Sequence, residues 1–271
     1  MSAVCILSGL TRDAAPQPNP QARNILILNL MPNRAVTEQQ FARTFARAGV
    51  DVNLTFILPA THHIRRNETA LRRAYRSFRD VEREQFDALI VTGAPLDQKQ
   101  FADVDYWDEL QTILQWRHGH VHGSLFLCWG ALAAGHIDGT FEGERLDRKI
   151  CGVYRCGQYL MPQSRYFRIP AANVTSGSVL AGDDALGACI ISNPVTHSTY
   201  VSGHFEYLPG TLAAEYHRDR RQNGADAATP QHYFDRDMRI RANWQHDAAS
   251  FYRDWLNAIP TQQPTKAIQE A

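Results

Sequence analysis

The sequence lacks several features that would each mark a class of protein. Its 271 residues hold 28 lysines and arginines against 28 aspartates and glutamates, so it has no basic excess of the kind that nucleic-acid-binding domains carry. No apolar run is long enough to cross a bilayer. Residues 1–9 are apolar, but they are few and lack the basic flank of a secretory signal peptide. We therefore expect a cytoplasmic protein whose partner is neither a nucleic acid nor a membrane.

Metal and disulfide signals are also weak. An odd number of widely spaced cysteines is not a disulfide framework, and the sequence has five: Cys5, Cys128, Cys151, Cys156 and Cys189. Cys151 and Cys156 lack the second pair that a zinc site needs. His118, His120 and His122 would share one face if extended and could then bind a metal, but a polar loop leading into the next strand is the favoured interpretation. We expect neither a metal nor a cofactor.

Apolar runs and helical spacing alternate along the first half of the chain. Runs typical of buried strands cover 24–30, 51–58, 88–92 and 124–128, and helical patterns lie between them at 37–48, 67–84 and 106–118. This alternation predicts an α/β fold, with a parallel sheet covered by helices on both faces. Ligands of such sheets bind at the carboxyl ends of the strands. Arg34, Asp97 and Cys128 all follow strand ends, so we expect them to share one cleft.

The second half is less regular. It predicts a strand pair at 188–193 and 198–202 and helices at 211–221 and 246–256. No flexible linker divides the chain. We expect an N-terminal leader over 1–23, a single domain over 24–258 and a polar, frayed tail over 259–271.

The stretch from Ser124 to Ala131 (SLFLCWGA) is the most informative one. An apolar run ends at Cys128 and passes at once into small residues that can open a helix. This pattern is typical of a nucleophile elbow, a strand-to-helix turn that projects a reactive side chain. A cysteine at the end of a buried strand is also a common small core residue, so the elbow needs a partner group to support it.

The fragment from Val201 to Tyr207 (VSGHFEY) offers that partner. In an extended conformation His204 and Glu206 point to the same side, because strand side chains alternate. Glu206 can then orient the imidazole of His204, which can activate Cys128. Isolated His-x-Glu pairs also occur on solvated strands. Taken together, the three residues predict a nucleophilic triad that transfers an acyl group through a thioester.

Short motifs in this order resemble the homoserine O-acyltransferase family of methionine biosynthesis. That family is similar in fold to class I glutamine amidotransferases, with a flavodoxin-like sheet. The matching stretches are NLMP at 29–32, TGAP at 92–95, VDYW at 104–107, LCWG at 127–130, GVY at 152–154, SR at 164–165, GHFEY at 203–207 and DWLN at 254–257.

The resemblance implies a role for each catalytic position. Cys128 would attack an acyl-CoA, His204 would act as the base, and Glu206 would orient His204. The backbone N–H of Trp129 would form part of an oxyanion hole. Arg34 stands where the family has a lysine that helps to hold the oxyanion.

The resemblance also implies a binding site for the amino acid. Arg218 would bind its carboxylate, a task that suits a bidentate guanidinium. Ser164 and Lys149 resemble family positions near the substrate. Acyl-CoA would be a co-substrate, not a bound cofactor, and a homodimer is the expected assembly.

Asp97 bears on the choice of acyl donor. The family has glycine at this position in succinyl-transferring members and an acid in acetyl-transferring ones. A carboxylate here would repel the free carboxylate of a succinyl group, so we expect acetyl-CoA to be preferred over succinyl-CoA.

Departures from the family pattern leave the acceptor open. They are Trp244-Gln245 in place of Trp-Arg, Leu132 in place of a glutamine, and the altered stretch 135–146. Homoserine is the expected acceptor, and L-serine, as in cysteine biosynthesis, is its rival. L-Serine is one methylene shorter, and a hydrophobic pocket discriminates between ligands that differ by one methylene by only about 1–3 kcal/mol. A glutamine amidotransferase-like hydrolase is the alternative enzyme, although Phe126 stands where that class usually has glycine. A binding protein with an inactive site is the non-enzymatic alternative.

Overall fold

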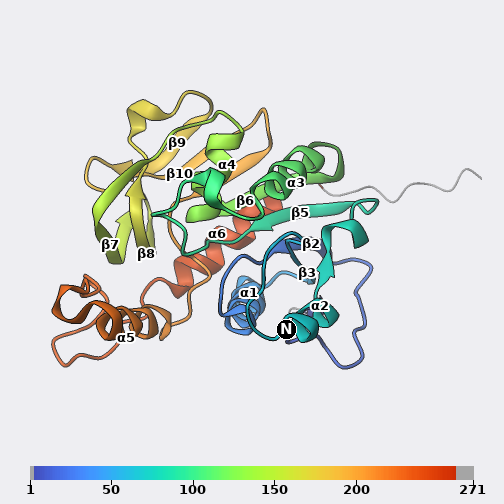
Figure 1. The fold of residues 1–271 in the computed structure, drawn as a ribbon, viewed down its shortest axis with the longest axis horizontal. Helices are drawn as coiled ribbons and strands as arrows, with labels where there is room; N and C mark the ends of the chain where they lie inside the picture. Colours follow the sequence, from blue (N-terminus) through green and yellow to red (C-terminus); the bar gives the residue numbers. More distant parts are fainter. Residues whose placement is uncertain (1–2, 261–271) are drawn as a thin grey trace, which may run out of the picture.

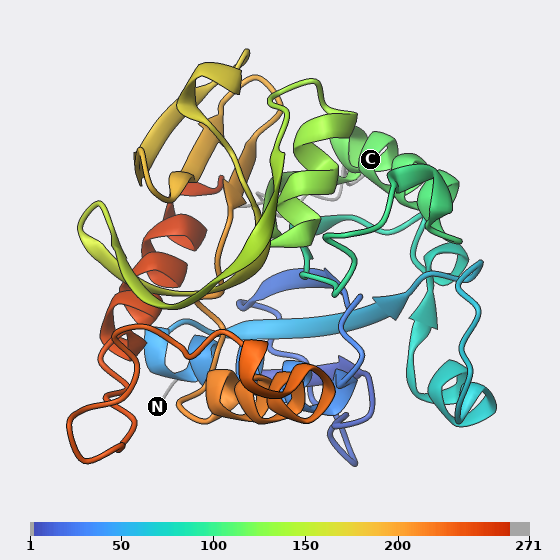
Figure 2. The same ribbon diagram turned by 60° about the vertical axis from the view of Figure 1, so that its left-hand side comes forward.

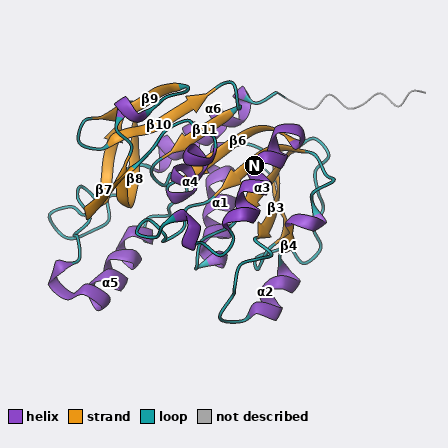
Figure 3. Ribbon diagram, turned by 45° about the horizontal axis from the view of Figure 1, so that its top comes forward, coloured by secondary structure: helices purple, strands orange, loops and turns teal. Residues whose placement is uncertain are grey.

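A nine-stranded, mostly parallel sheet forms the centre of the molecule in a computed structural model that describes residues 3–260 (Figures 1 and 3). The strand order is β1-β3-β2-β5-β6-β11-β10-β9, and the short β4 pairs with β3. All neighbours from β1 to β11 are parallel, whereas β10 and β9 are antiparallel. The strands are β1 (Val4–Ser8), β2 (Arg23–Leu28), β3 (Val52–Leu58), β4 (Arg76–Ser77), β5 (Phe86–Val91), β6 (Val121–Leu127), β9 (Ser178–Asp183), β10 (Gly187–Asn193) and β11 (Ser198–Val201).

Helices cover both faces of this sheet, as the sequence predicts. They are α1 (Arg34–Ala48), α2 (Glu68–Ala74), α3 (Trp107–His120), α4 (Trp129–Ile137), α5 (Thr211–Asn223) and α6 (Gln245–Ala258). Successive strand residues point to opposite faces. Ile25 and Ile27 of β2 therefore pack with α1 and α6, while Leu26 and Leu28 pack with α3 and α4. Burial on both faces explains why the parallel strands read as continuous apolar runs.

Aromatic contacts hold α1 against α6. The ring of Phe45 lies 5.1 Å, centroid to centroid, from that of Tyr252 and meets it edge to face. The helix α1 ends where Gly49 adopts a left-handed conformation with φ of 74°, which glycine enters without strain. This connection returns the chain to β3 and leaves the start of α1 at the carboxyl end of β2.

A strand lies within the stretch that the sequence analysis assigned to a leader. Residues Val4–Ser8 form β1, which pairs in parallel with β3 at the edge of the sheet. Its five residues carry too short a pattern to be recognised, and its pairing depends on a contact about fifty residues away. The predicted frayed tail after Pro260 lies outside the described residues.

The predicted helix over 67–84 is wrong in its second half. The helix α2 ends at Ala74, and Tyr75 turns into an extended conformation. Tyr75 is buried and donates a hydrogen bond to the buried carboxylate of Glu38. This tertiary contact overrides the helical periodicity.

The histidine run is not extended. The helix α3 continues through His120, whose Nδ1 lies 2.9 Å from the carbonyl oxygen of Trp116. Alternation therefore does not bring the three histidines to one face. Within residues 3–260 no group of three or more His, Cys, Asp or Glu side chains is arranged to hold a metal ion.

A long hairpin that the sequence analysis missed stands beside the main sheet. Its strands, β7 (Glu144–Cys156) and β8 (Tyr159–Arg168), pair antiparallel with Cys151 opposite Ser164. Figures 1 and 2 show this hairpin and α5 on the same side of the molecule. Among the described residues, no helix has both the length and the apolar character needed to span a membrane.

Candidate active site

Cys128 lies in a strained turn between β6 and α4. Its φ of 49° and ψ of −118° are rare for a residue with a side chain. Its N–H donates to the carbonyl oxygen of Val201 on the adjacent β11, at 2.7 Å, which holds the turn at the end of both strands. Such strain persists only where the surroundings impose it, and it is typical of functional sites. The predicted elbow is therefore present.

Two glycines make room for this turn. A Cβ added at Gly130 would lie 2.5 Å from the carbonyl oxygen of Thr92, so only glycine lets the start of α4 pack this closely on the end of β5. A Cβ on Gly93 would meet both the ring of His204 at 3.0 Å and the Cβ of Cys128 at 3.2 Å. Gly130 thus lets α4 pack on the end of β5, and Gly93 leaves space at the thiol and the imidazole.

His204 and Glu206 lie next to Cys128, although for a different reason from the one expected. The strand β11 ends at Val201, and the following residues form a turn closed by the N–H of Tyr207 and the carbonyl oxygen of His204. Within this turn His204 Nδ1 lies 2.7 Å from Glu206 Oε1. The register of β11 against β6 brings the turn level with Cys128, because Val201 pairs with Leu127.

The three side chains are buried and coupled electrostatically. Burial raises the pKa of the Cys128 thiol, and the neighbouring His204 opposes this shift. At His204 burial acts to lower the pKa, but Cys128 and Glu206 outweigh it and raise the pKa of the imidazole well above its ordinary value. The thiol Sγ lies 3.9 Å from the carbonyl oxygen of Ser164, and the imidazole hydrogen bonds with Glu206. His204 is thus placed to accept the thiol proton, and Glu206 stabilises the resulting cation.

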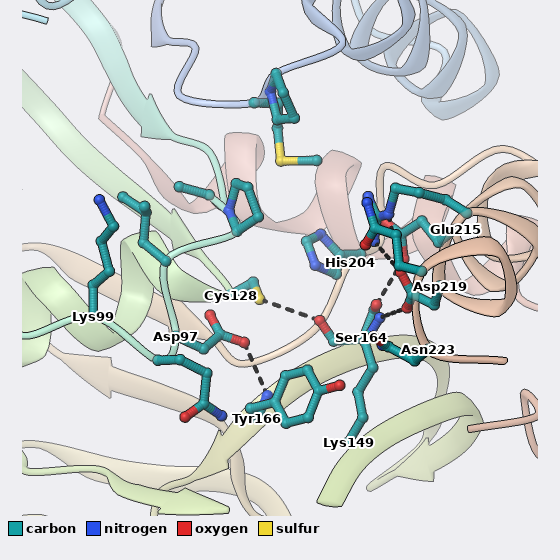
Figure 4. A pocket seen from close by; sticks show the side chains of 18 of the residues that line it. Asp97, Lys99, Cys128, Lys149, Ser164, Tyr166, His204, Glu215, Asp219 and Asn223 are labelled. Atoms are coloured by element: carbon teal, nitrogen blue, oxygen red, sulfur yellow. Dashed lines mark hydrogen bonds and ion pairs between the residues drawn. The ribbon is translucent and has the colours of Figure 1, made fainter. Parts of the chain in front are cut away.

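A cavity of about 240 Å³ opens at the thiol, and we call it the nucleophile cavity. In Figure 4 the thiol of Cys128 lies between Asp97 on one side and Ser164 on the other, with the ring of His204 beside it. Asp97 Oδ2 accepts a hydrogen bond of 2.9 Å from the N–H of Tyr166. Asp97 Oδ1 is buried without a hydrogen-bond partner among the described residues. Burial raises the pKa of this carboxyl group. A carboxylate therefore lines the cavity where an acyl group bound to Cys128 would lie.

Ser164 belongs to a hydrogen-bond chain that ends under the imidazole. Its Oγ donates to Glu215 Oε2 at 2.6 Å, and the Tyr207 hydroxyl donates to Glu215 Oε1 at 2.7 Å. The ring of Tyr207 stacks on that of His204, with centroids 4.1 Å apart and planes 17° from parallel. Glu215 on α5 thus ties the hairpin strand β8 to the group that supports the base.

Lys149 and Arg218 flank a second carboxylate of α5. Lys149 Nζ lies 2.8 Å from Asp219 Oδ2, and Arg218 binds Asp219 Oδ1 through both Nε and Nη2. Burial acts to raise the pKa of Asp219, but these two cations outweigh it and lower the pKa. Arg218 keeps 42% of its side chain exposed, so the guanidinium retains a face for a further anion.

Arg34 does not line the nucleophile cavity. It is the first residue of α1 and lines a larger neighbouring groove instead. The oxyanion role predicted for Arg34 stays a prediction. Trp129 is the first residue of α4, and N–H groups in the first turn of a helix have no acceptor within the helix. Its predicted oxyanion role stays a prediction.

Sequence reasoning missed Glu215, Tyr207 and Gly93. The spacing of Glu215, Arg218 and Asp219 places them on one helical face, which was the available signal for Glu215. Without the hairpin opposite, that face reads as a solvated helix surface. The assembled site joins a buried thiol, a base with its carboxylate and a polar cavity with charges of both signs. This arrangement can form and discharge a covalent intermediate on Cys128.

Comparisons with known proteins agree with this arrangement. Residues 6–265 match the family model described as homoserine O-succinyltransferase. A homoserine O-acetyltransferase from Leuconostoc mesenteroides is 40% identical over 245 residues, which cover 86% of this chain and 80% of that protein. A homoserine O-succinyltransferase from Pseudoalteromonas translucida is 35% identical over 254 residues, with the same two coverages of 86% and 80%.

A solved structure supports the fold. A glutamine amidotransferase from Thermotoga maritima superposes with a TM-score of 0.58 at 8% identity, and the match covers 88% of this chain and 97% of that one. This likeness confirms the predicted class I glutamine amidotransferase-like architecture and nothing finer. The family match and the two relatives together establish that this chain belongs to the homoserine O-succinyltransferase family and is an enzyme of the acyltransferase class.

Proposed function

We propose that this enzyme transfers an acetyl group from acetyl-CoA to the side-chain hydroxyl of L-homoserine, through a thioester on Cys128. The observation that carries the proposal is the buried Cys128–His204–Glu206 arrangement at an elbow that opens into a small polar cavity. The names of the relatives support the reaction and the acceptor, and the Leuconostoc protein supports the acetyl donor.

In the first half-reaction His204 takes the proton of Cys128, and the sulfur attacks the thioester carbonyl. The oxyanion that forms lies near the free N–H of Trp129 at the start of α4. The carbon–sulfur bond to CoA then breaks, and the CoA thiolate leaves with the proton held by His204. The acetyl group is now on Cys128, so the base is neutral again.

In the second half-reaction the amino acid enters beside α5. The exposed face of Arg218 binds its α-carboxylate, and Glu215 lies near enough to the base to bind its α-ammonium. His204 removes the proton of the side-chain hydroxyl, the oxygen attacks the acetyl carbonyl, and the Cys128 thiol is regenerated. Glu206 stabilises the imidazolium in both halves.

Asp97 supports acetyl-CoA as the donor. A succinyl group would place its free carboxylate in the cavity that Asp97 lines, with one Asp97 oxygen already lacking a hydrogen-bond donor. An acetyl group brings no charge. Electrostatic repulsion by Asp97 therefore disfavours succinyl-CoA and does not affect acetyl-CoA.

Intact-protein mass spectrometry tests the proposal directly. Wild-type enzyme mixed with acetyl-CoA should gain one acetyl group, and Cys128→Ala should gain none. A chase with L-homoserine should discharge the adduct, and L-serine should do so more slowly. Faster discharge by L-serine would overturn the acceptor. The absence of any adduct, together with release of ammonia from glutamine, would replace acyl transfer by the hydrolase function.

A further inference from the structure

The groove beside the nucleophile cavity is much larger than the cavity itself. It encloses about 1040 Å³, against about 240 Å³ for the space at Cys128. Pockets that enclose drug-sized ligands measure about 300–1,000 Å³. The nucleophile cavity therefore has room for an acyl group and a small amino acid, but not for the whole of a nucleotide-bearing thioester. The rest of such a donor must lie outside it.

The groove and the nucleophile cavity meet between β2 and β5, where the strand order of the sheet reverses. After β2 the chain crosses one face through α1, and after β5 it crosses the other face through α3. The loops that leave these two strands diverge at their carboxyl ends, which is where open α/β sheets bind ligands. The residues common to both spaces come from these loops: Pro32, Ala94, Pro95, Leu96 and Lys99. A bound molecule can thus pass from the thiol into the groove over a largely apolar rim.

Positive charge lines the groove. Arg34, Arg65, Arg66 and Lys99 line it, with His62 and His63 beside them. Arg65, Arg66 and Lys99 are exposed, and no ion pair involves them within the described residues. The Nε of Arg34 is buried and has no hydrogen-bond partner in the described part of the chain. Buried polar atoms normally have a partner, so this guanidinium has hydrogen-bonding capacity that the described residues leave unused.

Carboxylates in the groove are fewer and one of them is occupied. Asp103 and Asp105 are the two that line it. Asp105 accepts hydrogen bonds from the ring of His62 and the N–H of His63, so its charge is directed into its own loop. Four permanent cations therefore face one unengaged carboxylate, which favours a ligand with several negative charges.

Another cavity borders the nucleophile cavity, and it is less suited to hold the rest of the donor. It encloses about 270 Å³ and shares only Asp97 and Lys99 with the nucleophile cavity. Glu142 and Glu144 line it together with Arg145, so acidic groups are at least as numerous as cations there. A polyanion is repelled on this side and attracted on the other.

We infer that the groove lined by Arg34, Arg65, Arg66 and Lys99 binds the phosphate-bearing nucleotide end of the acyl donor, while its thioester end reaches Cys128 across Pro32, Pro95 and Leu96. This inference rests on the proposed acyl-CoA chemistry and adds the place where the donor is held. Arginine suits the task because its planar fork binds phosphate oxygens in pairs.

Calorimetric titration with free CoA tests the inference without turnover. The variant Arg65→Ala/Arg66→Ala should raise the Kd for CoA by about tenfold or more, equivalent to about 1.4 kcal/mol, and should flatten the dependence of affinity on salt. The control variant Arg73→Ala/Arg79→Ala removes two exposed arginines that do not line the groove. It should leave the Kd for CoA near the wild-type value.

An acyl donor without phosphates provides a second test of the inference. With the acetyl thioester of N-acetylcysteamine, the groove variant and the wild type should have the same kcat/KM, and the KM for the amino acid should not change. Equal CoA affinity in the groove and control variants, in an enzyme that still forms the acetyl adduct, would overturn the groove and leave the function standing. A wild type that binds no CoA and forms no adduct would overturn both.

Discussion

Replacing Asp97 should change the acyl donor. Asp97 is 9% exposed, so bulk water screens its charge poorly, and one of its oxygens has no donor among the described residues. A succinyl carboxylate about 4 Å away would be repelled by roughly 4 kcal/mol at an effective dielectric constant of about 20. At about 1.4 kcal/mol for each factor of ten, this corresponds to nearly three orders of magnitude in kcat/KM.

Two substitutions separate charge from volume. Asp97→Asn removes the charge at constant size and keeps an oxygen for the N–H of Tyr166. It should raise kcat/KM for succinyl-CoA by roughly two to three orders of magnitude and change that for acetyl-CoA little. Asp97→Gly adds space for the longer acyl chain and should raise the succinyl rate further. Asp184→Asn, at an exposed position remote from the cavity, is the control.

The pH dependence provides an independent check. Burial raises the pKa of Asp97, so the group becomes neutral as the pH falls through its raised pKa. The ratio of acetyl to succinyl kcat/KM should therefore fall with decreasing pH in the wild type and stay flat in Asp97→Asn. Titration of His204 affects both donors and cancels in the ratio. An unchanged donor ratio in Asp97→Asn at neutral pH would refute the electrostatic reasoning.

Substitutions at four further positions test the site. Cys128→Ser should keep the circular dichroism of the wild type and lose most activity, and activity in Cys128→Ala would rule out the nucleophile. Glu206→Gln should lower kcat by about 10²-fold or more with little change in KM, because the neutral amide no longer stabilises the imidazolium; a normal kcat would remove Glu206 from the triad. Arg218→Ala should raise the KM for the amino acid but not for acetyl-CoA, and equal effects on both would contradict its assignment. Gly130→Ala should lower the thermal midpoint, because its Cβ would lie 2.5 Å from the carbonyl oxygen of Thr92; Gly210→Ala, with open space around it, is the matched control.

The parallel strands were predictable because a strand that is buried on both faces needs apolar side chains at consecutive positions. β2, β3 and β5 are apolar along most of their length, and β6 ends at the one cysteine whose neighbours permit an elbow. Side chains that follow such strands gather at one edge for topological reasons. Cys128 and Asp97 line the same cavity for this reason, while Arg34 lines the neighbouring groove.

The hairpin and its partner helix were not predictable in the same way. β7 reads as a polar stretch because residues Glu144 to Ile150 are exposed or half-buried. Only the packing of α5 across the site gives Lys149 and Ser164 their partners. Glu215 likewise acquires a role only through its hydrogen bonds from Tyr207 and from Ser164, which lies 51 residues away in the sequence. Contacts of this kind depend on tertiary structure, which the local periodicity of hydrophobic residues does not reveal.

The placement of the two spaces has a kinetic consequence. The amino-acid side of the nucleophile cavity is built by α5 and the hairpin, whereas the groove is built by the loops after β2, β3 and β5. On the proposed mechanism, a donor held in the groove would approach Cys128 from the side of Pro95, and an acceptor held by Arg218 would approach it from the side of α5. On this mechanism, the acetyl group on Cys128 is the only substrate-derived group that the two half-reactions share. Departure of CoA would therefore leave the contacts of Arg218 and Glu215 unchanged, and the acceptor site would already be formed when the second half-reaction begins.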